Sequence, residues 1–389
     1  DQADALARLG LGLAIIRDGG LDEGRQQIEI AASLDPNSSI IRSYLGKAYY
    51  EEKRSDLDER EFTIAKELDP NDPTPYFYDA IAKQTTNRPV EALREYERAI
   101  ELNDNRMVYR SKLLLDSDEA ARQSGLARVY SDLGFQQLAL VEGWKAVGTD
   151  PTNYSAHRVL SDSYASRPRH EIARVSELLQ SQLLQPINIT PIQPQLAESN
   201  LFLLNAQGPS AAGFNTFNPL FNRNQATALL GGIGGSNDTW GGEGVVSAIY
   251  DKWSLSAGFT KFQTDGWREN SDFEDTLANI YAQYQFSYKT SVQAEYRYRD
   301  NERGDIKQRG FQEDYLLDYR LEDNVSSARL GFRHSFSPGS ILLGNFQYGD
   351  GEYGLADLFF LDPAEFGLPE PDVDDDFTFG DDQKVYGLE

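Results

Sequence analysis

One short signature recurs in the first half of the chain at a constant spacing. Leu34-Asp35-Pro36, Leu68-Asp69-Pro70 and Leu102-Asn103-Asp104 begin 34 residues apart. A unit of this length holds two short helices and a turn, and it must bury its apolar face against the next unit. Proline ends the second helix because it lacks the N–H that a helix interior needs. The pattern therefore predicts a stack of helical hairpins, an α-solenoid.

Small and large apolar residues recur at matching positions of these units, which is the tetratricopeptide pattern. The small residues let paired helices approach, and the large ones fill the space between them. About five repeats are predicted over residues 1–186, with an insertion near 105–117. The predicted packing residues are Gly12, Gly46, Tyr49, Ala65, Tyr96, Ala99, Tyr130 and Tyr164. Two interpretations stay open: a concave groove for a protein or peptide, or a spacer that only positions the next domain.

Residues 187–224 are predicted to form a Pro-rich linker. Pro186, Pro191 and Pro194 favour an extended, stiff chain. The segment also carries large apolar residues, at 201–204 and 213–224, which a solvated tether would not need. It is either a plug or strap at the mouth of the following domain, or an arm that docks the two domains together.

The segment Thr290–Asp300 alternates between an apolar and a charged face. Val292, Ala294 and Tyr296 point one way, and Glu295 and Arg297 point the other, because side chains on a strand alternate with period two. Other segments between 225 and 348 alternate in the same way. The predicted fold is thus an α + β two-domain chain. An N-terminal tetratricopeptide α-solenoid is followed by a transmembrane antiparallel β-barrel over residues 225–389, with about seven strands present and a truncation in strand eight.

The connections between these strands alternate in length. Tight turns at 251–252, 287–289 and 337–339 are separated by long links at about 263–275, 300–324 and 351–384. Outer-membrane barrels have short periplasmic turns and long external loops, so the solenoid is predicted to be periplasmic. Because an open sheet edge is not tolerated in lipid, either the chain is a fragment of a longer polypeptide or several chains share one barrel.

Alternation assigns side chains to the two faces of the barrel. The predicted membrane-facing residues are Trp253, Phe259, Tyr284, Phe286, Tyr296, Tyr298, Phe332 and Phe346. The predicted lumen-lining residues are Glu295, Arg297, Arg299, Arg329 and Arg333. These charges form either a basic ladder that guides an anionic solute or a salt-bridged wall.

Composition excludes several classes of function. The formal net charge of −25 argues against nucleic-acid binding, and the absence of cysteine excludes disulfides and thiolate metal sites. No nucleophile motif, phosphate loop or metal-type cluster is present, so we expect no enzyme activity, no cofactor and no metal. His157 and His170 are interpreted as packing or surface residues, and the acidic residues of 351–384 as a solvated loop.

The order of a helical repeat array followed by alternating strands resembles a known arrangement. It is similar to bacterial outer-membrane proteins with periplasmic tetratricopeptide repeats and a C-terminal β-barrel, including exopolysaccharide export porins. Pro168–Arg174, Pro186–Pro191 and Phe217–Asn224 resemble segments of an uncharacterised group of such proteins. The resemblance to the export porins implies a solenoid that recruits periplasmic partners and a barrel of about sixteen strands.

Two functional hypotheses follow, and a third, a barrel hydrolase, ranks below them because it would need a lumenal nucleophile and base beyond the strands present here. The first is an outer-membrane translocation pore whose solenoid recruits a periplasmic protein or peptide and whose barrel exports a polymer or other solute. The second is a non-conducting anchor or scaffold that displays the loops at 263–275, 300–324 and 351–384 to an extracellular partner. Both place the protein in the outer membrane, in contact with lipid.

Overall fold

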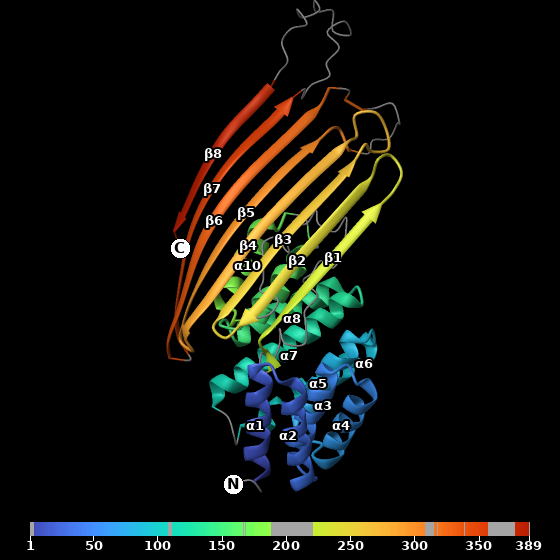
Figure 1. Cartoon of the computed structure of the whole chain (residues 1–389), viewed down its shortest axis with the longest axis vertical. Coiled ribbons are helices and arrows are strands. Elements are labelled where there is room, and N and C mark those ends of the chain that lie inside the picture. Colours follow the sequence, from blue (N-terminus) through green and yellow to red (C-terminus); the bar gives the residue numbers. More distant parts are fainter. Residues whose placement is uncertain are drawn as a thin grey trace, which may run out of the picture.

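The computed structural model describes residues 4–107, 111–165, 167, 169–187, 221–307, 315–316, 318–337, 339–356 and 378–388. Within these ranges a curved stack of helices is followed by one antiparallel sheet (Figure 1). The helices are α1 Ala5–Asp18, α2 Leu21–Leu34, α3 Ser39–Glu51, α4 Ser55–Leu68, α5 Pro73–Thr85, α6 Pro89–Glu101, the 3-10 helix η1 Asn103–Arg106, α7 Lys112–Asp132, α8 Gln136–Thr149, α9 Tyr154–Ala165 and α10 Glu171–Leu184. The strands are β1 Gln225–Gly234, β2 Trp240–Tyr250, β3 Trp253–Thr264, β4 Phe273–Ser287, β5 Thr290–Arg303, β6 Arg320–Ser337, β7 Ser340–Ala356 and β8 Thr378–Leu388.

Consecutive helices pack as hairpins, which confirms the predicted solenoid. α1 packs on α2, α3 on α4, α5 on α6, α7 on α8 and α9 on α10. The recurring aspartate organises the turn between units, since the side chains of Asp69 and Asp150 accept hydrogen bonds from the backbone N–H two residues later, at 3.0 and 2.9 Å. Asp72 then caps α5. The odd-numbered helices α3, α5, α7 and α9 contact one another in series, and so they line one face of the stack.

The expected insertion near 105–117 is helical at both of its ends. The chain forms η1 directly after α6 and then enters α7, which has 21 residues and is longer than the other described helices. Asn103 ties the two together, because its side-chain amide donates to the backbone oxygen of Leu115 at 3.2 Å. The additional residues therefore lengthen the first helix of the fourth hairpin.

The sheet is a simple meander in which each strand pairs with its sequence neighbours, in the order β1 to β8. The short connections lie at the end nearest the solenoid, and the long ones lie at the opposite end (Figure 1). Within the described residues β1 and β8 each have one partner, so the sheet is open and does not close into a barrel. The antiparallel sheet is confirmed, and the closed barrel stays a prediction.

Two details of the sheet differ from expectation. The eighth strand begins at Thr378 rather than near Val385, and it pairs with β7 over its whole length. The strands also extend into a segment predicted as a loop, 300–324. β5 continues through Arg303, and β6 already begins at Arg320. Ladder hydrogen bonds involve only the backbone, so charged residues that interrupt the apolar alternation still pair. The connections that remain are 265–272, 304–319 and 357–377.

Residues 221–224 fasten the start of the sheet to the first two hairpins. Phe221 is fully buried in the apolar cluster of α1, α2 and α3. Arg223 forms an ion pair with Glu51 at 2.8 Å, and Asn224 exchanges two hydrogen bonds with Asp251 in the turn between β2 and β3. This stretch of the predicted linker therefore serves as a docking arm, whereas residues 188–220 lie outside the described ranges.

A buried lysine shapes the electrostatics of this docking site. Lys47 on α3 is inaccessible to solvent, and its Nζ lies 4.6 Å from the ring centroid of Phe221. Burial lowers the pKa of the Lys47 ammonium to about 8, and the ion pair with Glu51, at 2.8 Å, opposes this shift. Glu51 thus forms ion pairs with both Lys47 and Arg223 where the arm meets the solenoid.

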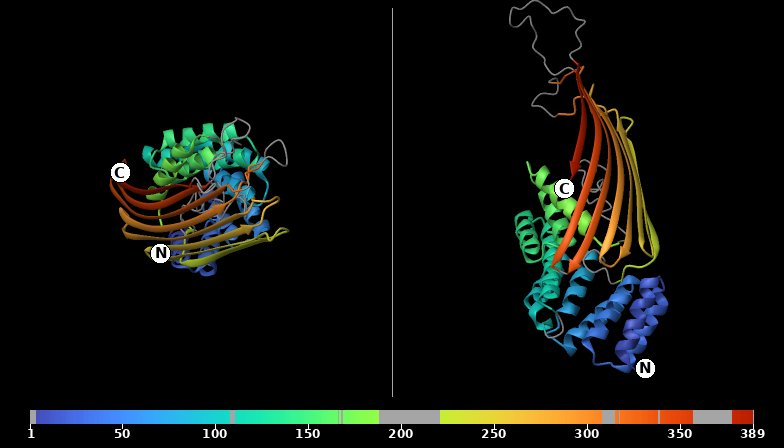
Figure 2. Two further views of the ribbon diagram at one scale, coloured as in Figure 1. Left: turned by 90° about the horizontal axis from the view of Figure 1, so that it is seen from above. Right: turned by 90° about the vertical axis from the view of Figure 1, so that its left-hand side faces the viewer.

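The last helix fastens the other end of the solenoid to the sheet. α10 lies against the inner, concave face (Figure 2). The side-chain amides of Gln283 and Gln293 donate to the backbone oxygens of Gln185 and Gln182. Gly331 leaves room for this contact, since a Cβ there would lie 2.8 Å from Cδ2 of Leu183. The solenoid and the sheet are therefore joined through both ends of the helical stack.

Candidate functional site: the inner face of the sheet and the solenoid groove

The eight predicted membrane-facing residues all lie on the outer, convex face of the sheet. The strand register places Trp253 opposite Tyr284, and Tyr284 opposite Val292, so that one side-chain face continues from strand to strand. At the solenoid end of this face the ring of Tyr284 lies 4.5 Å from Trp253 and 4.8 Å from Phe286. Phe259, Phe286, Tyr296, Phe332 and Phe346 are exposed. These side chains form an aromatic and aliphatic surface with no described element packed over it.

The five predicted lumen-lining residues lie on the inner face, where Glu295, Arg299 and Arg329 form ion pairs. Glu295 accepts hydrogen bonds from Arg329 on the adjacent strand, at 2.9 and 3.1 Å. Arg299 pairs with Asp275 at 2.9 Å. These contacts agree with a salt-bridged wall over this part of the face, because opposite charges on adjacent strands neutralise each other.

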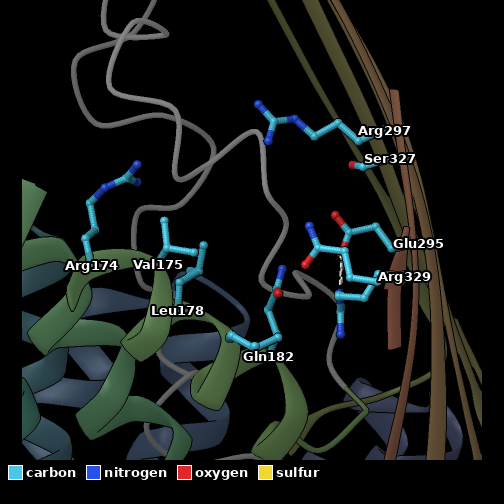
Figure 3. Close-up of a pocket in the computed structure, with 10 residues that line it drawn as sticks. Arg174, Val175, Leu178, Gln182, Glu295, Arg297, Ser327 and Arg329 are labelled. Carbon is cyan, nitrogen blue, oxygen red and sulfur yellow. Dashed lines mark hydrogen bonds and ion pairs between the residues drawn. The ribbon is translucent and has the colours of Figure 1, made fainter. Parts of the chain in front are cut away.

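A cleft separates α10 from the inner face of the sheet (Figure 3). Its volume is about 140 Å³. Arg174, Val175 and Gln182 face it from α10, while Arg297 and Arg329 face it from β5 and β6. Next to Gln182, the side chain of Leu183 packs on Gly331 of β6. The inner face is therefore covered by the chain itself at the solenoid end.

A second, larger cavity of about 500 Å³ lies on the solenoid and reaches the sheet. We call it the solenoid groove. Tyr44, Thr74, Phe77, Tyr78, Asp118, Arg122, Tyr154 and Ser155 line it from the odd-numbered helices. Arg106 of η1 and Asp150 add charges, and Leu184, Pro186 and Arg333 also line the groove. The groove thus combines aromatic walls, hydrogen-bonding groups and guanidinium groups from both halves of the chain.

The arginines of the groove differ in their partners. Arg122 is buried, donates to the side-chain oxygen of Asn103 and lies 5.5 Å from the ring centroid of Phe77. Arg106 donates to the hydroxyl of Thr74 at 2.5 Å. Nε of Arg333 is buried and has no hydrogen-bond partner in the described structure. Asp150 uses its carboxylate for the turn that begins the next hairpin.

The predicted packing residues of the solenoid lie between its helices. Gly12, Gly46 and Ala65 lie where helices approach closely, and Tyr96 and Ala99 are fully buried. Tyr49 donates a hydrogen bond to Glu29 at 2.7 Å. The ring of Tyr130 packs edge-on against Phe135, and the hydroxyl of Tyr164 accepts a hydrogen bond from Trp144. These residues support the hairpins, whereas the groove uses other side chains.

Both histidines of the solenoid have structural contacts. His157 is buried between Glu177, at 2.5 Å, and the backbone oxygen of Pro151, at 2.8 Å. The ring of His170 stacks on Tyr164. Among the described side chains no group of three or more His, Asp or Glu residues is arranged to hold a metal ion. No helix of the described ranges is both long and apolar enough to cross a membrane.

The sequence did not single out Arg106 or Arg122 as groove residues. Both lie in or just after the insertion, where the 34-residue register is lost and positions can no longer be matched between repeats. The strand register places Arg333 on the inner face, but nothing in the sequence indicates that it lines one groove with residues of α5 and α7. No sequence signal marks the first two, because arginine is as frequent before the break, at 88, 94 and 98, as at and after it, at 106, 110 and 122.

Comparisons with known proteins give similarities in shape at low identity. No protein-family model matches the chain, and no curated protein matches it. The APC/C hetero-tetramer Cut9–Hcn1 matches 49% of this chain with 15% identity and a TM-score of 0.42, and the match spans only 35% of that chain. Pseudomonas aeruginosa pilF matches 48% of this chain over 78% of its own length, with 15% identity and a TM-score of 0.40.

YrrB, described as a TPR protein with an unusual peptide-binding site, matches 48% of this chain over 89% of its own length. The identity is 16% and the TM-score is 0.34. The assignment of the helical half to a tetratricopeptide-like solenoid therefore rests on its own 34-residue period and hairpin packing.

Proposed function

We propose that this chain is a membrane-anchored binding scaffold. In this proposal the outer face of the sheet lies in the lipid of a bacterial outer membrane, and the solenoid extends into the periplasm. The solenoid groove holds a segment of a partner protein there. The sheet supplies attachment, and the groove supplies recognition.

The observation that carries the proposal is the apolar outer face. Large side chains are exposed across this face on seven strands: Leu230, Val246, Tyr250, Trp253, Leu255, Phe259, Ile280, Phe286, Tyr296, Leu330, Phe332, Leu342 and Phe346. A soluble protein seldom exposes a continuous apolar surface of this kind, because contact between apolar side chains and water costs free energy. In a bilayer the same side chains contact lipid, and this cost is absent. Strands of 10 to 18 residues are also long enough to cross one.

The connections support the orientation. Short turns occur at the solenoid end, and long connections occur at the far end (Figure 1). In outer-membrane proteins short turns face the periplasm. The solenoid would then lie in the periplasm, where partner proteins of secretion and surface assembly are found.

The contacts of α10 favour an anchor over an open pore. Gln182, Leu183 and Gln185 occupy the inner face next to Gln283, Gln293 and Gly331. A translocation pore that exports a polymer or other solute is the second candidate, and the guanidinium groups of Arg297 and Arg299 on the inner face support it. In a pore, α10 would narrow the path along the inner face at Gln283, Gln293 and Gly331.

Cell fractionation of the full-length protein tests the proposal. We expect it in the outer-membrane fraction, with the solenoid digested by protease only after the outer membrane has been permeabilised. Recovery in the soluble fraction would reject the membrane assignment. Planar-bilayer recordings then separate the two candidates: silence at all voltages supports the anchor, and steady conductance supports the pore.

A further inference from the structure

Two arginines of the solenoid groove have no carboxylate partner in the described structure. Elsewhere on the solenoid many arginines are neutralised, as in the pairs of Arg42 with Glu61 and Arg128 with Asp162. Among the described residues Arg106 donates to the Thr74 hydroxyl and to no carboxylate, and Arg333 is half-buried with its Nε unpaired. A guanidinium that is removed from water without a counter-charge costs free energy. In an acidic chain with net charge −25, two such groups facing one cavity need an explanation.

The position of Arg333 depends on the docking of the two domains. It lies near the solenoid end of β6, directly opposite Ser291 on β5 and two residues beyond Gly331. The close packing of Leu183 on Gly331 brings this end of the sheet to the groove, where Leu184 and Pro186 are its neighbours. The groove is therefore complete only when the sheet is docked on α10.

We infer that the solenoid groove binds an acidic segment of a partner protein, and that the sheet contributes Arg333 to this site. Arg106 and Arg333 would each donate charge-assisted hydrogen bonds to carboxylates of the segment, which are stronger than neutral ones. The inference rests on the proposed function, because it specifies which partner the scaffold holds.

The walls of the groove favour a peptide as the source of these carboxylates. Phe77, Tyr78, Leu184 and Pro186 offer apolar surface between the charged positions. Asn153 and Ser155 add hydrogen-bonding side chains. A segment in which acidic residues alternate with apolar ones satisfies both kinds of surface. The two aspartates of the groove, Asp118 and Asp150, would oppose a partner of uniformly high negative charge.

Fluorescence anisotropy on the full-length protein in detergent tests the inference. The probe is a fluorescein-labelled peptide in which Asp and Glu alternate with Leu and Phe, and its matched control carries Asn and Gln instead. We expect Arg333→Gln and Arg106→Gln each to weaken binding of the acidic probe by about tenfold, because each removes a charged hydrogen-bond donor. Arg60→Gln is the matched variant, since Arg60 is exposed on α4 outside the groove.

Further arms separate a charge effect from a folding effect. Arg333→Lys keeps the charge and should retain most of the binding. Arg333→Glu should lose the acidic probe and gain affinity for a peptide with Lys at the same positions. Melting temperature is measured for every variant, and a binding loss counts as support only where that temperature is unchanged.

Several results would overturn the inference. Equal binding of the acidic and amide peptides would show a groove without charge selection, and the scaffold proposal would survive. Unchanged binding by Arg333→Gln would remove the sheet from the site. Polygalacturonate that binds where the acidic peptide does not would assign the groove to an acidic polysaccharide. Absence of the protein from the outer-membrane fraction, in contrast, would reject the proposed function itself.

Discussion

At the scale of single residues, glycines set how closely the helices of the solenoid approach. A Cβ at Gly46 would lie 2.6 Å from the ring of Phe62, and one at Gly125 would lie 2.3 Å from the ring of Tyr96. Real Cβ atoms do not come this close to ring carbons, so any side chain at these positions must displace an aromatic ring. Both rings are fully buried in the core.

Replacement of Gly125 by alanine is therefore expected to destabilise the helical half. We expect Gly125→Ala to lower the free energy of unfolding by about 1–3 kcal/mol, the usual cost of overpacking a core. Gly148→Ala is the matched control, since Gly148 also lies in a helix but nothing is within 4 Å of its Cβ position. That control should gain up to about 1 kcal/mol from helix propensity. Urea unfolding followed by circular dichroism at 222 nm measures both, and equal stabilities would contradict the expectation.

The pairing of Gly125 with Tyr96 also shows what residue patterns predict. Gly46 and Tyr96 were predicted as packing residues because they fall at repeat positions of the 34-residue register. Gly125 was not, although Tyr130, which follows the same insertion, was. The local pattern identifies which residues pack. Which residue each of them contacts, such as Tyr96 of α6 for Gly125 of α7, depends on how the helices are arranged in space.

At the scale of elements, α10 connects the two halves of the molecule. On one side it is held to α9, where Glu177 bonds to His157 and the Ser181 hydroxyl donates to the backbone oxygen of Tyr154 at 2.6 Å. On the other side its end contacts the sheet through Gln182 and Leu183. Any change that loosens α10 on α9 is therefore expected to affect the inner face and the solenoid groove together.

The contact of His157 makes the docking of α10 depend on pH. Burial alone lowers the pKa of His157, but the hydrogen bonds to Glu177 and to the Pro151 oxygen, with the charge of Glu177, raise it above its ordinary value. A raised folded-state pKa stabilises the fold fully below about pH 6.5, the ordinary pKa of histidine, and this stabilisation is lost as pH rises through the folded-state pKa.

We therefore expect α10 to open more readily at pH 8 than at pH 6. Hydrogen exchange of residues 171–184, corrected for the intrinsic rate at each pH, measures the opening. His157→Gln should weaken protection at pH 6 by about 1 kcal/mol and remove most of the pH dependence. The neighbouring cation on α9, Arg158, is paired with Asp162 at 3.1 Å. A variant that keeps the wild-type pH dependence would show that a group other than His157 titrates.

At the scale of the whole molecule, the two faces of the sheet belong to different environments. The inner face carries amides, hydroxyls and ion pairs, and part of it packs on α10. The outer face carries large apolar side chains that contact no other described element. Neighbouring residues of one strand point to opposite faces, so the proposal can be tested with adjacent substitutions.

Phe346 and Gln347 on β7 make this matched pair. Phe346 lies on the outer face and Gln347 on the inner one, where it lines the cleft beside α10. We expect Phe346→Lys to destabilise the membrane-inserted protein by about 2–4 kcal/mol, because a lysine would then face lipid. Gln347→Lys should cost much less. Folding into phospholipid vesicles, titrated with urea, measures both, and equal effects would place the outer face in water.

Much of this architecture followed from sequence because its signals are periodic. A 34-residue period predicts helical hairpins, a two-residue period predicts strands with two unlike faces, and the alternating lengths of connections predict the direction of the sheet. The ends of elements were less predictable: β5 and β6 extend into segments rich in charge because backbone pairing does not depend on side-chain polarity.

The sequence by itself determined the class of each half and the face on which each strand residue lies, since both depend on contacts between near neighbours in the chain. Only the tertiary structure decided how the halves meet. Three features join residues that are far apart in sequence: the burial of Phe221 in the first hairpins, the packing of α10 on the inner face, and the lining of one groove by both Arg106 and Arg333. No local period encodes such contacts, because they depend on the packing of whole elements against one another.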